Sequence, residues 1–528
     1  VLPVALFGVI ATVSVSLVLF LKETPLRYDA VGYNRLAISI KDDLRYSYDE
    51  SSPPTAYYPP LYPAFVALIY KLVGEQYKAI YLAQAILHGL TAAGVFYIAR
   101  ALSLSSFLAA MAALLTGFYP GLIGATRFVI VEPLHTFLII SGVLVSTLVL
   151  KRPSLFLAAL AGFMWGLSAL CKPVTFGVPF AIVALFLVPG KKEQGSLLAH
   201  SLMLLLFFVL TLAPWTIRNL LLFDRPVLVS TNTGVNFYLG TLRPLTFDAN
   251  DIRVRPVIEE AKTKGFNEAE TDGLFAQKAI DNIVADPTAF LKRVMENSVM
   301  LWAMPVVWQG YAKDAPFLTK PSFTVDSYGL HKGLVLLGLF GLSMAAIIRD
   351  AKFLVIAIPI LWFTVVYSVT FVQTRFNLPG MPLLVLGGVY FLDALQAQMR
   401  PALLRAVVVL LALWSPLVLF TTYMPPSSVE SLHPYSNGIN RTWTIVNPDE
   451  NAPNSRIHFI RMDLGSGDKL ELYDMWGELH QVMAAGQLED GGWSDVVPGR
   501  VIAVNLISDD TNAGWGFKID RIVTVNGE

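Results

Sequence analysis

Long apolar stretches recur along most of this sequence, and they constrain its fold more than any other feature. Residues 1–21 contain no charged side chain, and a helix of that length rises about 30 Å, the thickness of a bilayer's hydrocarbon core. Similar stretches lie at residues 79–99, 105–125, 133–150, 154–171, 174–189, 197–217, 330–348, 353–372, 378–392 and 406–424. Because 55% of the residues are hydrophobic and only 15% are charged, we expect a polytopic α-helical membrane protein with about eleven transmembrane helices.

The first apolar stretch is expected to be a membrane span and not a signal peptide. It is long, it lacks a small-residue cleavage site, and no basic residue precedes it in this chain. Since the chain begins at Val1 and not at Met, a few residues are expected to precede it.

Lys and Arg are distributed unevenly between the loops that join these stretches. If Val1 is cytoplasmic, the short loops on that side hold nine cations, namely Arg100, Lys151, Arg152, Lys191, Lys192, Arg349, Lys352, Arg400 and Arg405. The short loops on the other side hold only Arg127, Lys172 and Arg375. Cytoplasmic loops are the ones rich in Lys and Arg, so we expect a multi-pass protein of the plasma (inner) membrane. Residues 22–78, 218–329 and 425–528 would then face the extracytoplasmic side.

Charge and cysteine content exclude several classes of protein. The formal net charge is zero and the isoelectric point is about 7.2, so no nucleic-acid partner is indicated. The single cysteine, Cys171, excludes an internal disulfide and a thiolate metal site. No phosphate-binding P-loop and no glycine-rich dinucleotide motif is present, so a soluble nucleotide-dependent enzyme is not supported.

The first outer segment, residues 22–78, is expected to lie along the membrane surface. Apolar and aromatic residues recur there at helical spacing, at Val31, Tyr33, Leu36, Ala37 and Ile40. This spacing predicts an amphipathic surface helix, followed by a proline-rich turn and a second short helix at 62–73. Asp29 stands where the first of these helices should begin. A purely structural role would explain Asp29 as a capping or first-turn acid that interacts with the helix dipole.

Four cations stand at the outer ends of predicted spans, each beside a proline or an aromatic residue. They are Arg127 in GATRFVIVEPLHTFL, which also holds Glu132; Lys172 in LSALCKPVTF; Arg218, followed by Asn219, in LAPWTIRNLLLF; and Arg375 in VQTRFNLPG. Any one of them is explained by a basic side chain that reaches the lipid headgroups. Together with an acid they would form a cationic pocket at the membrane boundary, which is suited to a lipid-linked phosphate.

Six sequence motifs in this order resemble those of the C-type membrane glycosyltransferases that use polyprenyl-phosphate sugars, a group that includes protein O-mannosyltransferases and the lipid A aminoarabinose transferase. The motifs are YDAVGYNRLA, YYPPLYPAFVALIYKLVG, TRFVIVEPLHTFL, GLSALCKPVTF, APWTIRN with STNTGVNFYLG, and TRFNLPGMPLL. The resemblance covers roughly residues 1–424 and implies the C-type glycosyltransferase fold for them.

The resemblance also implies an activity and a set of site residues. One sugar would pass from a polyprenyl-phosphate donor to a hydroxyl of a glycan, lipid or protein acceptor at the extracytoplasmic face. Asp29 would be the catalytic base, Lys172, Arg218, Arg375 and Arg127 would bind the donor phosphate, and Glu132, Tyr33, Tyr58 and Asn219 would position the sugar or the acceptor. Many members have a second acid beside the first, whereas Ala30 follows Asp29 here. We therefore expect no metal in the transferase site and no cofactor, with a divalent cation as the alternative.

Two other activities stay open. Transfer of an oligosaccharide from a polyprenyl diphosphate would favour a metal and a roomier site, which the missing acid pair disfavours. A transporter or flippase of lipid-linked glycans would show internal repeats and ionisable residues near mid-membrane, whereas the ionisable residues here gather at one face.

Residues 218–329 form the second large outer loop. Its TNTGVNFYLG segment has the Asn and Gly content of a tight loop. Residues 274–304 show helical apolar spacing interrupted at Asp286-Pro287, which predicts two helices. Their structural interpretation is a lid over the site.

Short alternating stretches replace the apolar runs in residues 425–528. They are IHFIRMDL, KLELYD, RVIAVNLI and KIDRIVTV, and their period of two predicts an extracytoplasmic β-sandwich domain. GDKLELYD and VNLISDDTNAGWGFKID resemble the CUB domain, in which acids at the positions of Asp468 and Asp509 bind calcium in some members. The domain would either bind the acceptor or pack on the membrane domain.

Overall fold

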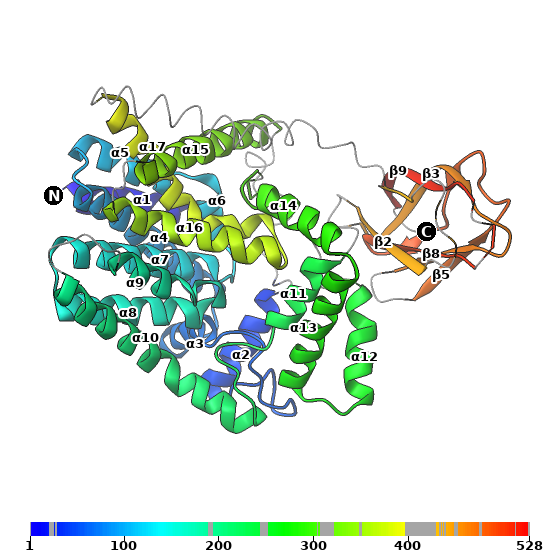
Figure 1. Cartoon of the computed structure of the whole chain (residues 1–528), viewed down its shortest axis with the longest axis horizontal. Helices are drawn as coiled ribbons and strands as arrows, with labels where there is room; N and C mark the ends of the chain where they lie inside the picture. Colours follow the sequence, from blue (N-terminus) through cyan, green and yellow to red (C-terminus); the bar gives the residue numbers. More distant parts are fainter. Residues whose placement is uncertain are drawn as a thin grey trace. The chain divides into compact units, whose positions relative to one another are not determined.

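The computed structural model describes residues 2–20, 26, 29–187, 194–242, 252–303, 305–306, 321–347, 351–396, 429–431, 435, 437, 440–447, 452–474, 478–509, 511–512 and 514–525. The chain packs as two compact units. The first, which we call the helical unit, comprises residues 1–233, 267–272 and 288–418. The second comprises residues 234–266, 273–287 and 419–528, and it contains the β-strands (Figure 1). The predicted boundary at residue 424 between two domains stays a prediction.

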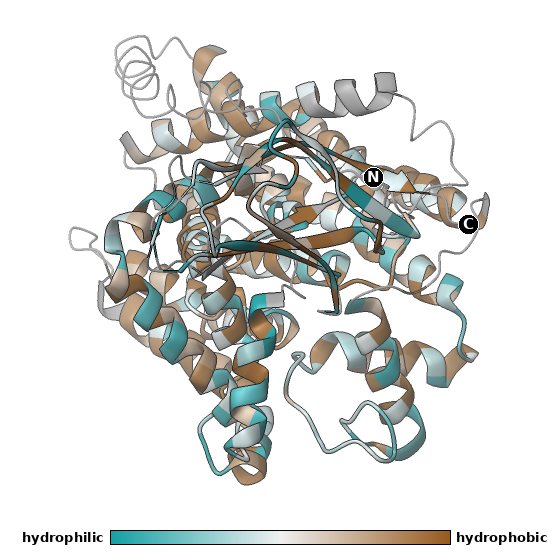
Figure 2. Ribbon diagram, turned by 90° about the vertical axis from the view of Figure 1, so that its right-hand side faces the viewer, coloured by the Kyte–Doolittle hydropathy of each residue, from teal (hydrophilic) through white to brown (hydrophobic). Residues whose placement is uncertain are grey.

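Helices cover all the predicted apolar stretches that fall within the described residues. They are α1 (Leu2–Phe20), α4 (Tyr77–Ala101), α5 (Ser106–Gly117), α6 (Pro120–Ala125), α7 (Glu132–Lys151), α8 (Leu155–Cys171), α9 (Val178–Phe186), α10 (Gln194–Phe223), α15 (Pro321–Ile347), α16 (Ala351–Val369) and α17 (Met381–Gln396). The predicted span at 406–424 lies outside the described residues. Hydrophobic residues, brown in Figure 2, run along much of these helices.

Six of the described helical segments are long and apolar enough to cross a membrane. They begin at Leu2, Tyr77, Glu132, Leu197, Gly329 and Thr374, and five further apolar helices are shorter. The prediction of a multi-pass helical membrane protein is thereby confirmed, whereas the number of spans stays a prediction.

The predicted span at 105–125 is divided into two helices. α5 ends at Gly117, and α6 begins at Pro120. Proline has no backbone N–H and disfavours helical backbone in the residue before it, here Tyr119, so one continuous helix is interrupted at this point.

Glycines permit close approach between neighbouring helices of this unit. α8 lies between α7 and α10 (Figure 1), and a Cβ added at Gly162 of α8 would meet the backbone oxygen of Leu204 at 2.0 Å. Similarly, a Cβ at Gly341 of α15 would meet the backbone oxygen of Gly387 in α17 at 1.8 Å. Small residues allow helix backbones in a membrane to pack this closely.

Gly341→Ala is therefore expected to destabilise the helical unit, because even one methyl group forces α15 and α17 apart. Overpacking of this kind costs about 1–3 kcal/mol. The measurement is the thermal midpoint of the purified protein in detergent. Gly333→Ala in the same helix is the matched control, since a Cβ there meets nothing within 4 Å. Equal midpoints for the two variants would show that the close approach of these backbones is not required.

Two helices follow α1 as predicted, and their position along the membrane surface stays a prediction. α2 (Asp29–Asp43) and α3 (Leu61–Val73) pack on each other, with Tyr33 and Ala37 of α2 and Tyr62 and Val66 of α3 in one buried cluster. This contact holds the start of α2, and with it Asp29, against the rest of the helical unit.

The second outer loop contains four helices and one 3-10 turn in its described residues. They are α11 (Thr233–Thr241), η2 (Ile252–Val254), α12 (Arg255–Thr263), α13 (Glu268–Ala285) and α14 (Pro287–Ala303). The predicted interruption at Asp286-Pro287 is confirmed. The prediction of a tight loop at TNTGVNFYLG is wrong, because α11 buries Val235 and Leu239, four residues apart, on one helical face.

Two antiparallel sheets make up the described part of the C-terminal region. The strands are β1 (Val429–Glu430), β2 (Asn440–Val446), β3 (Asn454–Asp463), β4 (Lys469–Tyr473), β5 (Leu479–Ala484), β6 (Gly492–Trp493), β7 (Val497–Pro498), β8 (Val501–Ile507) and β9 (Gly516–Val525). One sheet has the order β1-β9-β3-β6, with β7 also on β3, and the other has the order β2-β8-β4-β5. Their inner faces share one core, in which Trp443 and Phe517 meet at 4.8 Å between ring centroids. The predicted β domain is confirmed, and its resemblance to the CUB domain stays a prediction.

Candidate active site

Asp29 is the first residue of α2, and its carboxylate is held by two residues from distant parts of the chain. The Tyr58 hydroxyl donates a hydrogen bond to Oδ1 at 3.0 Å. The Arg375 guanidinium forms a hydrogen-bonded ion pair with Oδ2. Arg375 lies in η4 (Thr374–Gly380), a 3-10 turn that leads into α17, so residues 346 positions apart meet here.

Glu132 provides a second carboxylate next to Arg375. It is the first residue of α7 and is only 1% exposed. Its Oε1 lies 3.5 Å from Nζ of Lys172 and 3.7 Å from Nε of Arg375. Neither carboxylate oxygen has a hydrogen-bond partner among the described residues. A buried carboxylate without hydrogen bonds is costly, so this position is suited to accept donors from a bound molecule.

Two carboxylates and two cations therefore alternate at the ends of four helices. Lys172 follows α8, and its Nζ lies 3.9 Å from the centroid of the Phe376 ring, which shields one side of the ammonium group. We call Asp29, Glu132, Lys172 and Arg375 the charged cluster. Lys172 and Arg375 can therefore contact an incoming anion while each carboxylate keeps a cation nearby.

Protonation at this site is governed by these contacts. Burial raises the pKa of the Asp29 carboxyl, but the charge of Arg375 and the hydrogen bonds from Arg375 and Tyr58 outweigh burial and hold the pKa below its usual value. Burial and the neighbouring Asp29 charge raise the pKa of Tyr58 well above its usual value. Asp29 is thus an ionised acceptor at neutral pH, and Tyr58 is a protonated donor.

The lowered pKa of Asp29 makes stability depend on pH in one direction. A carboxyl with a lower pKa in the folded state than in the unfolded state contributes stability above the unfolded pKa, and this is lost as pH falls through the folded pKa. We expect the thermal unfolding temperature of the wild type to decrease as the pH is lowered below about 4. In Asp29→Asn this decrease should be smaller. Thermal denaturation of both proteins in detergent across this range is the measurement. If the unfolding temperatures of the two proteins changed equally with pH, the lowered pKa of Asp29 in the folded protein would be contradicted.

Among the described residues, Arg218 makes no hydrogen bond or ion pair with the charged cluster, so its predicted place beside Asp29 is not supported by a direct contact. Its Nη1 donates hydrogen bonds to the backbone oxygen of Thr55 at 2.8 Å and to Oδ1 of Asn219 at 2.9 Å. Its guanidinium lies 4.7 Å from the Trp215 ring centroid. Arg218 is thus connected to Asp29 through the segment 55–58, which supplies Tyr58.

Glu268, which the sequence analysis did not single out, anchors the same segment. Its carboxylate accepts hydrogen bonds from Oγ1 of Thr55 at 2.6 Å, from the backbone N–H of Ala56 at 2.8 Å, and from Oγ1 of Thr231. In the sequence it is one of several acids at the start of a polar helix, and no local pattern distinguishes it. Only the contact across 212 residues shows its role.

Glu268→Gln is expected to lower activity roughly tenfold by loosening the segment that aligns Tyr58 with Asp29. The amide replaces one acceptor oxygen with a donor and removes the charge that strengthens these bonds. Initial transfer rates of purified proteins are the measurement. Glu270→Gln is the matched control, because Glu270 lies on the same helix and pairs with the exposed Arg225. Similar rates for the two variants would refute the positioning role of Glu268.

The remaining predicted residues are Tyr33, Asn219 and Arg127, and of these Tyr33 contacts a residue that binds Asp29. Tyr33 is buried, with its ring centroid 4.7 Å from that of Tyr58 and 4.9 Å from that of Tyr62. Asn219 is buried and donates to the backbone oxygen of Val227 at 3.1 Å. Arg127 is buried in the turn between α6 and α7. The structure thus brings Asp29, Tyr58, Glu132, Lys172 and Arg375 together, while the roles of all these residues stay predictions.

The two acids that were predicted to bind calcium are neighbours in the β domain. Oδ1 of Asp468 accepts the backbone N–H of Asp509 at 2.8 Å, and Oδ2 accepts the Tyr435 hydroxyl. Oδ1 of Asp509 accepts the N–H and the hydroxyl of Thr511. Calcium takes six to eight oxygen ligands, and these acids supply two carboxylates that already accept protein donors. The described contacts therefore explain the acids as loop anchors, and the calcium site stays a prediction.

The fold and this site define a multi-pass membrane protein with a buried, charge-paired site at its helix ends. Residues 57–217 match the family described as dolichyl-phosphate-mannose-protein mannosyltransferase. The predicted resemblance to membrane glycosyltransferases is thereby confirmed over this segment. The matched segment includes Tyr58, Glu132 and Lys172, and it does not include Asp29 or Arg375. No curated protein matches the chain.

Three solved structures show a distant likeness to this chain. The Archaeoglobus fulgidus oligosaccharyltransferase is 14% identical with a TM-score of 0.44, over 79% of this chain and 54% of that one, so the chain spans about half of its length. ArnT from Cupriavidus metallidurans bound to undecaprenyl phosphate is 15% identical with a TM-score of 0.35, over 83% and 82%. The arabinosyltransferase EmbB from Mycobacterium smegmatis is 11% identical with a TM-score of 0.30, over 98% and 64%.

Proposed function

We propose that this protein transfers a single sugar from a polyprenyl-phosphate donor to an acceptor hydroxyl at the extracytoplasmic face of the plasma membrane. The observation that carries the proposal is the charged cluster, in which ionised Asp29 shares Arg375 with the buried Glu132, and Glu132 also pairs with Lys172. A general base next to two cations suits the displacement of a phosphate by a hydroxyl. The uneven distribution of Lys and Arg between the loops supports the extracytoplasmic placement.

In this mechanism the acceptor oxygen attacks the anomeric carbon while the bond from that carbon to the phosphate oxygen breaks. Asp29 takes the proton of the acceptor hydroxyl, and the phosphate leaves on the polyprenyl chain with the electron pair of the broken bond. General-base catalysis of this kind contributes about 10²- to 10⁴-fold in rate. Lys172 and Arg375 stabilise the negative charge that develops on the phosphate.

Arg375 connects donor binding to the strength of the base. In the free protein it pairs with Asp29 and holds the pKa of Asp29 low, which makes the carboxylate a weak base. A donor phosphate that engages Arg375 weakens this pairing, so the pKa of Asp29 rises when the donor is bound. The base thus becomes effective only when the leaving group is in place.

In this proposal Glu132 contacts the sugar. Its oxygens lack hydrogen bonds among the described residues, and the hydroxyl groups of a sugar would supply them. Tyr58, which donates a hydrogen bond to Asp29, offers an aromatic face for the same ring, and the buried Tyr33 packs behind it.

The proposal is tested by incubating the purified protein with synthetic polyprenyl-phosphate sugars, with the matching polyprenyl-diphosphate oligosaccharides, and with extracted envelope glycans as acceptors. Mass spectrometry of the lipids should show free polyprenyl phosphate formed from the monophosphate donors only. Mass spectrometry of a deletion strain should show the accumulated donor and the unmodified acceptor. Turnover of the diphosphate donors alone would overturn the proposal in favour of oligosaccharide transfer, and movement of intact donor across vesicles would favour a flippase.

A further inference from the structure

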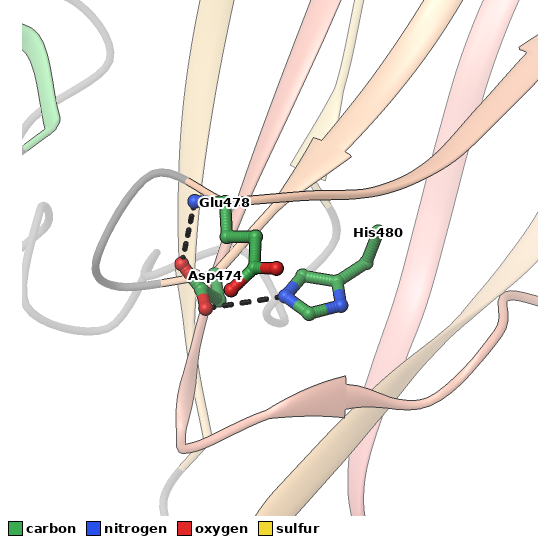
Figure 3. A group of neighbouring side chains, drawn as sticks. All are labelled: Asp474, Glu478 and His480. Carbon is green, nitrogen blue, oxygen red and sulfur yellow. Dashed lines mark hydrogen bonds and ion pairs between the residues drawn. The ribbon is translucent and has the colours of Figure 1, made fainter.

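A second group of converging side chains lies in the β domain, where β4 ends and β5 begins. Asp474 directly follows β4, Glu478 directly precedes β5, and His480 is the second residue of β5. One ligand atom from each of the three lies within 4.8 Å of the others (Figure 3). Among the described residues, no other group of three histidine, cysteine or acidic side chains converges in this way.

Hydrogen bonds between Asp474 and Glu478 hold these side chains in place. Asp474 is 2% exposed, its N–H donates to the backbone oxygen of Glu478 at 3.0 Å, and its Oδ1 accepts the Glu478 N–H at 2.9 Å. Its other oxygen, Oδ2, lies 3.1 Å from Nε2 of His480. One carboxylate oxygen thus links the end of β4 to the start of β5, while the other faces the histidine.

One carboxylate of this group has no partner of its own. The Glu478 carboxylate has neither a hydrogen bond nor an ion pair with any residue that the structure describes, and it is turned toward His480 and Asp474 (Figure 3). Two carboxylates that face each other across one imidazole repel when both are ionised. A divalent cation between the three groups would remove this repulsion.

We propose that Asp474, Glu478 and His480 bind a first-row divalent metal ion of the zinc type, with water in the remaining coordination positions. One imidazole nitrogen and two carboxylate oxygens are ligands that Zn²⁺ accepts, whereas Ca²⁺ and Mg²⁺ prefer oxygen alone. Nε2 of His480 would bind the metal in its unprotonated form. This site is separate from the charged cluster and from the pair Asp468 and Asp509, and it does not depend on the proposed transferase activity.

The same domain provides a matched control. His458 pairs with Asp520 through Nδ1 and Oδ1 at 2.6 Å, on the neighbouring strands β3 and β9. Among the described residues this pair has no third metal-ligating side chain beside it. It therefore represents a histidine–carboxylate pair that needs no metal.

The test is a titration of the full-length protein in detergent, purified without a histidine tag and stripped of metal by a chelator. With Zn²⁺ competed against a chromophoric chelator, we expect one site in the wild type and in His458→Ala. Its affinity should fall at least about tenfold in Glu478→Gln and in His480→Ala. Glu478 is exposed and its substitution is isosteric, so this variant tests the site even if His480→Ala unfolds.

Thermal denaturation supplies a second readout. Zn²⁺ should raise the unfolding midpoint of the wild type and of His458→Ala, and it should raise that of Glu478→Gln less, because a ligand bound only to the folded state stabilises it. Equal zinc affinity and equal stabilisation in all four proteins would overturn the proposal. Tighter binding of Ca²⁺ than of Zn²⁺ that is lost in Glu478→Gln would overturn the choice of a zinc-type ion.

Discussion

Asp29→Asn should reduce sugar transfer at least about 100-fold while leaving donor binding nearly intact. The amide keeps the shape of the side chain and can still accept from Tyr58, but it cannot take a proton from the acceptor hydroxyl. The loss should therefore appear in the turnover rate and not in the Michaelis constant for the donor. Single-turnover transfer from a labelled polyprenyl-phosphate sugar is the measurement.

The control for this variant lies on the same helix. Asp42→Asn removes an exposed acid near the end of α2 that pairs with Lys41, and it should transfer sugar at the rate of the wild type. Retention of substantial turnover in Asp29→Asn, with the fold verified by its thermal midpoint, would remove Asp29 as the base.

Arg375→Ala is expected to have the second large effect, a decrease of about 10²- to 10³-fold in kcat/KM. Arg375 contacts both carboxylates of the charged cluster, so its removal leaves Asp29 and Glu132 with Lys172 as the remaining cation of the cluster. The variant should bind polyprenyl phosphate more weakly, and the pKa of Asp29 should be higher in the free protein because its main electrostatic partner is gone.

Arg375→Lys separates charge from geometry. A lysine keeps the positive charge but lacks the planar fork that reaches Asp29 and Glu132 together, so it should recover only part of the activity. Lys262→Ala, at an exposed pair with Glu259, should have no effect. Full activity in Arg375→Ala would exclude Arg375 from the reaction.

Much of the fold could be predicted from the sequence because a bilayer imposes a length and a composition on each span. The helix α2 was also predictable, since its apolar residues recur at helical spacing, and the strands of the β domain follow an alternation with period two. The interruption at Tyr119 and the helix α11 were missed. In both places hydropathy or composition was given more weight than the local backbone chemistry of proline and the burial of one helical face.

The residue types of the site could be predicted, but their pairing could not. The sequence places four charged residues near the ends of apolar stretches, namely Asp29, Glu132, Lys172 and Arg375. This position indicates that they lie on a common face of the membrane, but it does not indicate which of them form pairs. That Arg375 pairs with Asp29, and that Arg218 instead contacts the segment beginning at Thr55, depends on how distant helices pack. Glu268 carries no local signal at all, because its partners are fixed only by tertiary structure.

Binding of polyprenyl phosphate to the charged cluster is the central claim, and it can be measured without knowledge of the acceptor. Native mass spectrometry of the detergent-solubilised protein, titrated with polyprenyl phosphate, gives the dissociation constant for the wild type, Lys172→Gln and the exposed control Lys71→Gln. We expect Lys172→Gln to bind at least about tenfold more weakly, because a partly buried ammonium that faces a phosphate contributes a charge-assisted hydrogen bond, while Lys71→Gln should match the wild type. Equal affinity in all three proteins would contradict the account.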